Sequence, residues 1–125
     1  MTTAISVNKY IYNILTSNTD LNKLVGKKIY PIVAEESTTF PFIVIKRTNI
    51  TTEYCKDGKV NDRCDFTVTI AANNYAESVS IAEQVRKLIE LKRNDYFNLI
   101  HLWSVSEDYI DNTYIQELTF NAILK

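Results

Sequence analysis

Asp65-Phe66-Thr67-Val68-Thr69-Ile70 carries the clearest structural signal in the chain, because apolar and polar residues alternate strictly along it. Successive side chains of an extended strand point to opposite faces of a sheet. Phe66, Val68 and Ile70 therefore share one face, and the threonines share the other. The pattern predicts a strand whose inner face packs on a core and whose outer face is polar.

A helix is predicted directly after this strand. Asn74 and Glu77 are three residues apart, as in a capping box, which satisfies backbone N–H groups at a helix start. Small and apolar residues then keep a spacing near 3.6 over about 75–91: Ser78, Val79, Ala82, Val85, Leu88 and Ile89. The polar residues of this helix are interpreted as solvated surface: Glu77, Glu83, Gln84, Lys87 and Lys92.

The N-terminal segment predicts an amphipathic helix over residues 3–16. Its apolar positions are Ala4, Val7, Ile11, Ile14 and Leu15. A short helical turn follows, in which Thr19 or Asp20 is the expected cap. Gly26 is expected to close this turn, because glycine adopts the left-handed conformation at little cost.

Two strands are predicted before the alternating one. Pro31 cannot donate a ladder hydrogen bond, so a strand within 28–33 is short or lies at a sheet edge. Pro41 precedes the run 42–47, which is apolar on both faces, as is typical of a central strand.

Residues 49–63 are polar and contain Asp57-Gly58, a tight-turn pair, so they are interpreted as an exposed hairpin arm or a long loop. Toward the C-terminus, 99–106 and 113–124 predict two strands joined near 108–112. The whole pattern predicts a single α+β domain over residues 1–125. We expect an antiparallel or mixed sheet of 4–5 strands, two helices packed on one face, and a protruding hairpin arm.

Composition narrows the class of function. The chain has 125 residues, with 14 Lys and Arg against 15 Asp and Glu, so its net charge of -1 disfavours a general nucleic-acid binder. It has only 2 Gly, too few for a glycine-rich phosphate loop. The first residues lack the pattern of a secretory signal, and no apolar run is long enough to span a membrane. We expect a soluble protein made in a cytoplasm.

Candidate chemical groups are few. Cys55 and Cys64 could form a disulfide across the hairpin or half of a metal site, but a zinc site needs four ligands and the single His cannot complete it. Two reduced thiols in a reducing compartment are the favoured interpretation. His101, the only histidine, lies inside a predicted strand, with Ser104 and Ser106 at polar strand positions. The carboxylates Glu107, Asp108 and Asp111 lack the spacing and glycine of a calcium loop and are interpreted as a solvated hairpin end. We expect no catalytic set, cofactor or metal.

The tyrosine content has two interpretations that the sequence leaves open, a surface for binding other proteins and ordinary strand composition. The chain has 8 Tyr, a residue suited to surfaces that both pack and hydrogen bond, although tyrosine is also a good strand former. The 34–41 loop and the 49–63 arm are long and polar, as functional loops are. The predicted interface residues are Glu35, Thr38, Tyr54, Lys56, Asp57, Lys59, Asp108 and Tyr109.

Several stretches, in order along the chain, resemble the tail completion, or tail terminator, proteins of long-tailed bacteriophages. They are Leu21, Leu24-Val25-Gly26, Ile29-Tyr30-Pro31, Phe40-Pro41-Phe42-Ile43-Val44, Phe66 to Ile70, Asn74-Tyr75-Ala76-Glu77-Ser78, Ile81-Ala82, Val85-Arg86, Leu88, Glu107-Asp108 and Tyr114 to Phe120. No single motif is specific, so the resemblance rests on their order and spacing. Ala71-Ala72 departs from it, since similar proteins often carry a large residue before the second helix.

This resemblance implies a structural virion protein without enzymatic activity. Such proteins form a ring, usually of six copies, on the head-proximal end of the tail tube, where they end tube growth and offer the head-joining surface. The implied partners are further copies of the chain, the tail tube protein and a head completion or stopper protein. DNA would pass through without being gripped, no membrane would be involved, and assembly would occur in the bacterial host cytoplasm. Another neck or connector component, such as a head-tail adaptor, or a baseplate adaptor is the alternative.

Overall fold

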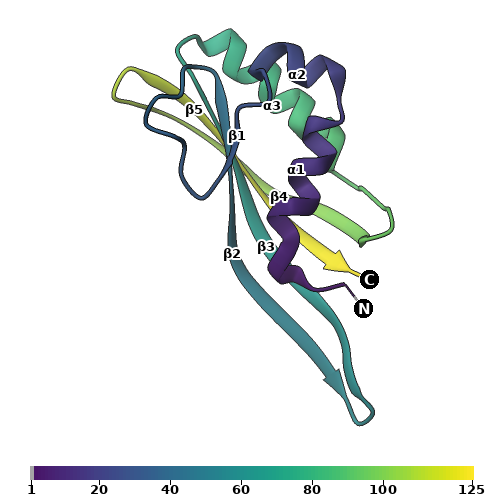
Figure 1. The fold of residues 1–125 in the computed structure, drawn as a ribbon. Coiled ribbons are helices and arrows are strands. Elements are labelled where there is room, and N and C mark those ends of the chain that lie inside the picture. The colour runs from purple at the N-terminus through teal and green to yellow at the C-terminus, as the bar shows by residue number, and fades with distance from the viewer. Residues whose placement is uncertain (1) are drawn as a thin grey trace.

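The computed structural model describes residues 2–125, and for Lys59 and Val60 it describes the backbone alone. In chain order the elements are a 3-10 helix (Ala4–Ser6), α1 (Val7–Thr16), α2 (Thr19–Val25), β1 (Ile29–Pro31), β2 (Phe42–Cys55), β3 (Gly58–Ala72), α3 (Tyr75–Ile89), β4 (Phe97–Ile110) and β5 (Thr113–Leu124). The strands form one sheet in the order β1-β2-β3-β5-β4. The predicted α+β class and mixed sheet are confirmed (Figure 1).

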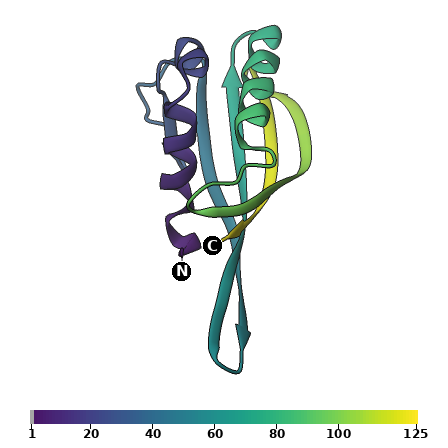
Figure 2. The ribbon, with the colours of Figure 1, turned by 90° about the vertical axis from the view of Figure 1, so that its right-hand side faces the viewer.

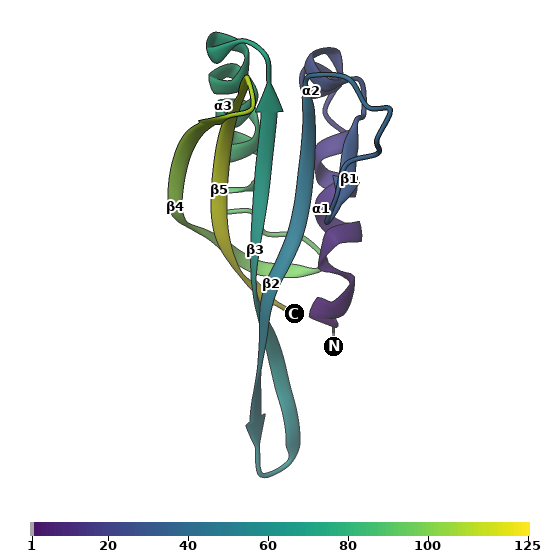
Figure 3. The same ribbon diagram turned by 90° about the vertical axis from the view of Figure 1, so that its left-hand side faces the viewer.

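The sheet is mixed because its first pair differs from the rest. β1 and β2 are parallel, whereas β2 and β3, β3 and β5, and β4 and β5 are antiparallel. The segment through α3 therefore connects β3 to β4 by crossing over β5. β1 and β4 end the sheet on opposite sides, and they run in opposite directions (Figure 3).

All the helices lie on one face of the sheet (Figure 2), where α1 packs on β2 and α3 packs on β3 and β5. The predicted inner residues Phe66, Val68 and Ile70 are fully buried there. The Phe66 ring stacks on that of Phe120 with 5.3 Å between the ring centroids. Full burial of an aromatic side chain contributes about 1.5–3 kcal/mol, so this stack anchors the core. The threonines of β3 lie on the opposite, half-exposed face.

At the helix ends, side-chain and backbone conformations agree with the sequence-based predictions except at the start of α2. Asn18, and neither Thr19 nor Asp20, caps α2: its backbone is extended, and its side-chain oxygen accepts from Leu21 N at 2.8 Å. Thr19 already belongs to the helix. Gly26 closes α2 with φ 60°, as predicted. At α3 the predicted cap is confirmed, since Asn74 accepts from Glu77 N at 3.1 Å.

Residues 49–63 form a hairpin arm, which settles the alternative between an arm and a loop (Figures 1 and 3). Cys55 pairs with Gly58, so Lys56 and Asp57 are the turn, one residue earlier than the predicted Asp57-Gly58 pair. Gly58 follows the turn with φ 122°, a conformation that residues with a side chain rarely adopt.

The connection between β4 and β5 is also tighter than predicted. Asp111 and Asn112 alone form the turn, and both have positive φ, 51° and 61°. This is the backbone twist of a tight two-residue hairpin, which Asp and Asn tolerate better than most residues. Asp108 and Tyr109 therefore belong to strand β4, and the expectation that they lie in a polar loop is wrong.

Candidate interaction surfaces

The predicted interface residues lie at three separate places. Glu35 and Thr38 are in the loop beside β1, Tyr54, Lys56 and Asp57 are in the arm, and Asp108 and Tyr109 are on β4 at the opposite edge of the sheet. Lys59 follows the arm's turn, but its side chain lies outside the described part of the chain. The fold does not bring these residues together into one site.

The loop beside β1 is held in place by polar contacts. The Tyr30 and Thr38 hydroxyl oxygens are hydrogen-bonded at 2.8 Å, and Lys28 Nζ donates to the Thr39 carbonyl oxygen at 3.0 Å. Glu35 remains exposed on the loop. Apolar side chains are exposed as well: Ile32 is 68% and Val33 is 73% exposed. This loop therefore presents a fixed surface with both apolar and charged groups.

The arm is tied to the body at its base. Asp62 Oδ1 accepts from the Thr52 hydroxyl at 2.7 Å, and Asp62 Oδ2 accepts from the backbone N–H of Ala4 at 2.9 Å. Pairing of β3 with β5 ends at Arg63, so nearer the tip β3 pairs with β2 alone. Tyr54 is 76% exposed there. A two-stranded ribbon without further cover is marginally stable in water, so the arm is suited to contact another chain.

The β4 edge carries functional candidates that sequence reasoning missed. Leu102 pairs with Phe120 and Ser104 with Thr119, which leaves Trp103 as the extra residue of a β-bulge, 63% exposed. Val105 and Ile110 are also exposed on this strand, as is Tyr109, which the sequence had already suggested. The bulge shifts the alternation of faces, so a period of two could not place these side chains. The usable signal was the single tryptophan itself.

A polar cluster lies where β4 approaches α3. Glu107 Oε2 accepts from the Tyr75 hydroxyl at 2.9 Å and from Gln116 Nε2 at 3.1 Å. The hydrogen bond to Glu107, together with its negative charge, raises the pKa of Tyr75. Asp108 and Asp111 are exposed nearby. Among the described residues, no group of three or more His, Cys, Asp and Glu side chains could hold a metal ion.

The other candidate chemical groups are isolated from one another. His101 is half-buried on β4 opposite Asn121. Cys55 and Cys64 are unbonded thiols, the first exposed near the arm's turn and the second buried in the core. Burial raises the pKa of the Cys64 thiol from 9.0 to about 12, so this group stays neutral at pH 7. The disulfide alternative is therefore not realised.

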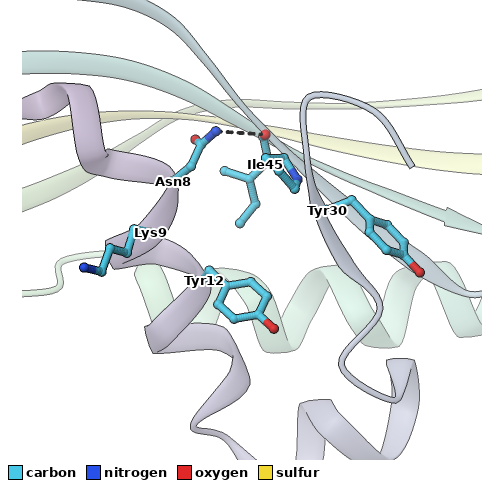
Figure 4. A pocket seen from close by; sticks show the side chains of 6 residues that line it. Asn8, Lys9, Tyr12, Tyr30 and Ile45 are labelled. Carbon is cyan, nitrogen blue, oxygen red and sulfur yellow. Dashed lines mark hydrogen bonds between the residues drawn. The ribbon is translucent and has the colours of Figure 1, made fainter. Parts of the chain in front are cut away.

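A cavity of about 270 Å³ opens between α1 and the β1 side of the sheet. Its lining residues are Asn8, Lys9, Tyr12, Tyr30, Pro31 and Ile45. Figure 4 shows the Tyr12 and Tyr30 rings and the Ile45 side chain around it, with Asn8 Nδ2 donating to the Ile45 carbonyl oxygen at 3.5 Å. Its lining is mostly apolar and lacks the several converging polar groups of a substrate pocket.

These features define a class of protein: a small α+β domain with two unlike sheet edges and a projecting arm, whose exposed surfaces are suited to contact with other proteins. Among the described helices, none has the length and apolarity needed to cross a membrane. The chain belongs to the family of the tail completion protein gp17, whose sequence pattern it matches over residues 9–124. It is thus a structural tail protein of phage-type virions, and the resemblance inferred from the sequence is confirmed.

The fold has a counterpart of known structure. It is similar to a chain in the virion of a native gene transfer agent (GTA) particle, with a TM-score of 0.78 and 15% sequence identity. The similarity covers 91% of this chain and 90% of that chain. A comparison with curated proteins found no match.

Proposed function

We propose that copies of this chain form a ring on the head-proximal end of the tail tube. The ring has six copies, ends tube growth and offers the surface to which the filled head joins. Membership of the tail completion family carries this proposal. All of residues 1–125 act as one tail-terminator domain, which works by binding and catalyses no reaction. Its partners are other copies, the tail tube protein and a head completion or stopper protein, in particles assembled in the host cytoplasm.

The two sheet edges support a ring. Subunits of a closed ring contact each neighbour through different surfaces, one on each side. This sheet ends in a three-residue strand, β1, on one side and in a 14-residue strand, β4, on the other. Each side exposes large apolar residues, among them Val33 and Trp103. The long edge of β4 can add another strand, whereas the short β1, which ends in Pro31, offers exposed apolar side chains instead, so the two sides are suited to contact neighbouring copies in different ways.

The arm is proposed to contact the tube or the head component. Its polar tip extends past the other strands (Figure 3), and its base is anchored through Asp62. Tyr54, Lys56, Asp57 and Lys59 remain proposed contacts of this arm. Glu35, Thr38, Asp108 and Tyr109 remain proposed contacts at the sides of the sheet.

Passage of DNA is compatible with the open face of the sheet. That face carries hydroxyls and charges of both signs rather than a basic stripe, including Lys46, Asp65 and Glu117. Asn121 Nδ2 donates to Asp65 Oδ1 at 2.8 Å on this face, so this carboxylate is held by a hydrogen bond within the chain. Binding to the DNA backbone depends on many Lys and Arg contacts, and a chain of net charge -1 does not offer a general basic surface.

Particles produced without this protein test the proposal. Tails of uncontrolled length without heads are expected, and supplying the protein in trans should restore both length and joining. Tails of normal length that fail to join heads would instead indicate a neck adaptor. Complete absence of tails would indicate a baseplate component. Either result contradicts the proposed role.

The arm can be tested separately by replacing residues 54–60 with an Asn-Gly turn. Because Glu53 and Asn61 are paired, the shortened hairpin should still close, and unfolding by urea should be little changed. The shortened protein should fail to join the tail tube or the head. A matched control, Lys87→Ala on the exposed side of α3, should join normally. Normal joining by the shortened chain would remove the arm from the proposal.

A further inference from the structure

We propose that neighbouring copies in the ring meet through the β4 edge of one copy and the β1 edge of the next. The β4 edge is defined here as Trp103, Val105, Glu107, Asp108, Tyr109, Ile110 and Asp111. The β1 edge is defined as Lys23, Lys27, Lys28, Ile32, Val33 and Phe40. This inference rests on the proposed ring and names the surfaces that build it.

The strand registers determine which residues of β1 and β4 lie at the same level along the strand direction. One row of paired residues crosses the entire sheet: Ile29, Ile43, Ile70, Gln116 and Glu107. The start of β1 and the end of β4 therefore lie at the same level along the strands. Figure 3 shows both at the end of the sheet away from the arm.

Residues of opposite charge lie next to the two ends of this row, both on the side away from the arm. β1 and β4 are antiparallel to each other, so Lys28, just before Ile29, is level with Asp108, just after Glu107. Lys27 precedes Lys28 and is exposed, as is Asp108. If copies stand side by side at equal height, the acidic end of one meets the basic end of the next. Complementary charges of this kind set the register and orientation of partners.

Apolar groups match at the next levels. Pro31 and Val105 are the two ends of another row of paired residues that crosses the entire sheet. Ile32 lies just beyond this row on one edge and Trp103 lies beyond it on the other, both on the side nearer the arm. Trp103 is 63% and Ile32 is 68% exposed. A protein surface rarely exposes several large apolar residues together unless it binds a partner. Both edges thus carry charged residues at the end away from the arm, together with Phe40 on one edge and Tyr109 and Ile110 on the other, and large apolar residues nearer the arm.

The backbone of Ile32 supports the same assignment. Its φ is 66°, a left-handed conformation that a β-branched residue adopts only with strain. The conformation is held by a hydrogen bond from Ile32 N to the Ile45 carbonyl oxygen at 2.9 Å. Strain that holds an apolar side chain in solvent is consistent with a contact made on assembly.

This arrangement also places the arm. Side-by-side copies at equal height are related by rotation about an axis roughly along the strands. Every arm then projects from the same rim of the ring, parallel to the tail axis. The arm is thereby directed to the tube or head component, and the sides of the sheet are left for neighbouring copies.

Cross-linking within assembled tails tests the edges. We suggest a chain with Cys55→Ser, Val33→Cys and Ser104→Cys, treated with a short bismaleimide; Cys64 is buried and should not react. A ladder of products larger than a dimer is expected, because each copy links to two neighbours. Chains with only one of the two new cysteines should give no ladder and little dimer. Dimers as the main product of a single-cysteine chain would mean that like edges meet, which overturns the inference.

Charge reversal gives a second test. Lys27→Glu and Asp108→Lys should each reduce the ring fraction roughly tenfold, since attraction becomes repulsion. The double variant should recover most of it, whereas damage to the fold would not be recovered. Lys87→Glu, away from both edges, is the control. Rings that form equally in all variants overturn the edge pairing but leave the ring intact. A wild-type chain that forms no ring on tails overturns the ring and the inference with it.

Discussion

Asp62 joins two segments that are 58 residues apart, because its side-chain oxygen Oδ2 accepts a 2.9 Å hydrogen bond from the backbone N–H of Ala4. Its other oxygen accepts from the Thr52 hydroxyl at 2.7 Å. The residue is only 3% exposed. The carboxylate therefore connects the N-terminal helix to the base of the arm, and the orientation of the arm depends on it.

Replacing Asp62 should destabilise the protein. Asp62→Ala leaves a buried N–H and a hydroxyl without their acceptor, and hydrogen bonds to charged groups are worth about 1.5–3 kcal/mol. We expect the free energy of unfolding to fall by about 2 kcal/mol in urea titrations. Asp57→Ala, in the exposed turn, should have almost no effect. Equal stability of both variants would contradict the anchoring role.

The stacked rings of Phe66 and Phe120 should be the most sensitive part of the core. Phe120→Ala opens a cavity at a fully buried position and should cost about 3–5 kcal/mol. Phe120→Leu fills part of that space and should cost less. Thermal unfolding measures both, with Tyr54→Ala as an exposed aromatic control. A cost of less than about 1 kcal/mol for Phe120→Ala would show that the site collapses without loss.

Gly26 is expected to matter through its backbone alone. An added Cβ would meet nothing within 4 Å, but the φ of 60° penalises any side chain. Gly26→Ala should therefore lower stability by about 1 kcal/mol, and Gly26→Asn by less, because Asn tolerates this conformation better. Circular dichroism on heating would measure the order of the variants. An alanine variant as stable as the wild type would contradict this reasoning.

The two thiols should differ in reactivity. Cys55 is exposed and Cys64 is buried, so a disulfide reagent such as DTNB should modify one thiol quickly in the folded protein and two after denaturation. Cys55→Ser should remove the fast phase. Two fast thiols in the folded wild type would mean that the base of the arm opens readily.

Alkaline pH should weaken the fold through Cys64. Its folded pKa of about 12 lies above the ordinary value of 9.0, so the neutral thiol is the form that the folded state favours. This contribution to stability is complete below pH 9.0 and is lost as the pH rises toward 12. The stability difference between the wild type and Cys64→Ala should shrink over that range. A difference that stays constant would indicate that the thiolate is tolerated in the core.

Much of the fold was predictable because its signals are local. The alternation around Phe66, the cap at Asn74 and the left-handed Gly26 depend on neighbouring residues only. The sequence also supported the α+β class and the tail completion family. The errors were local as well: Asn18 caps α2 where Thr19 or Asp20 was expected, since several adjacent residues can accept the same hydrogen bond.

The interface candidates were harder to predict, for a different reason. Glu35, Tyr54 and Asp108 were chosen as polar or aromatic residues in expected loops, but they lie on three sides of the molecule. Trp103 was missed because a bulge interrupts the alternation of its strand.

Patterns within about 15 residues were sufficient to specify helices, turns and the inner face of the central strand, because backbone propensity and amphipathic spacing act over that range. The alignment of Lys28 with Asp108 across five strands has a different origin. It follows from four successive strand registers and from the crossover through α3, each of which depends on packing between distant segments. Only the folded chain therefore brings a basic and an acidic group to the same level on opposite edges.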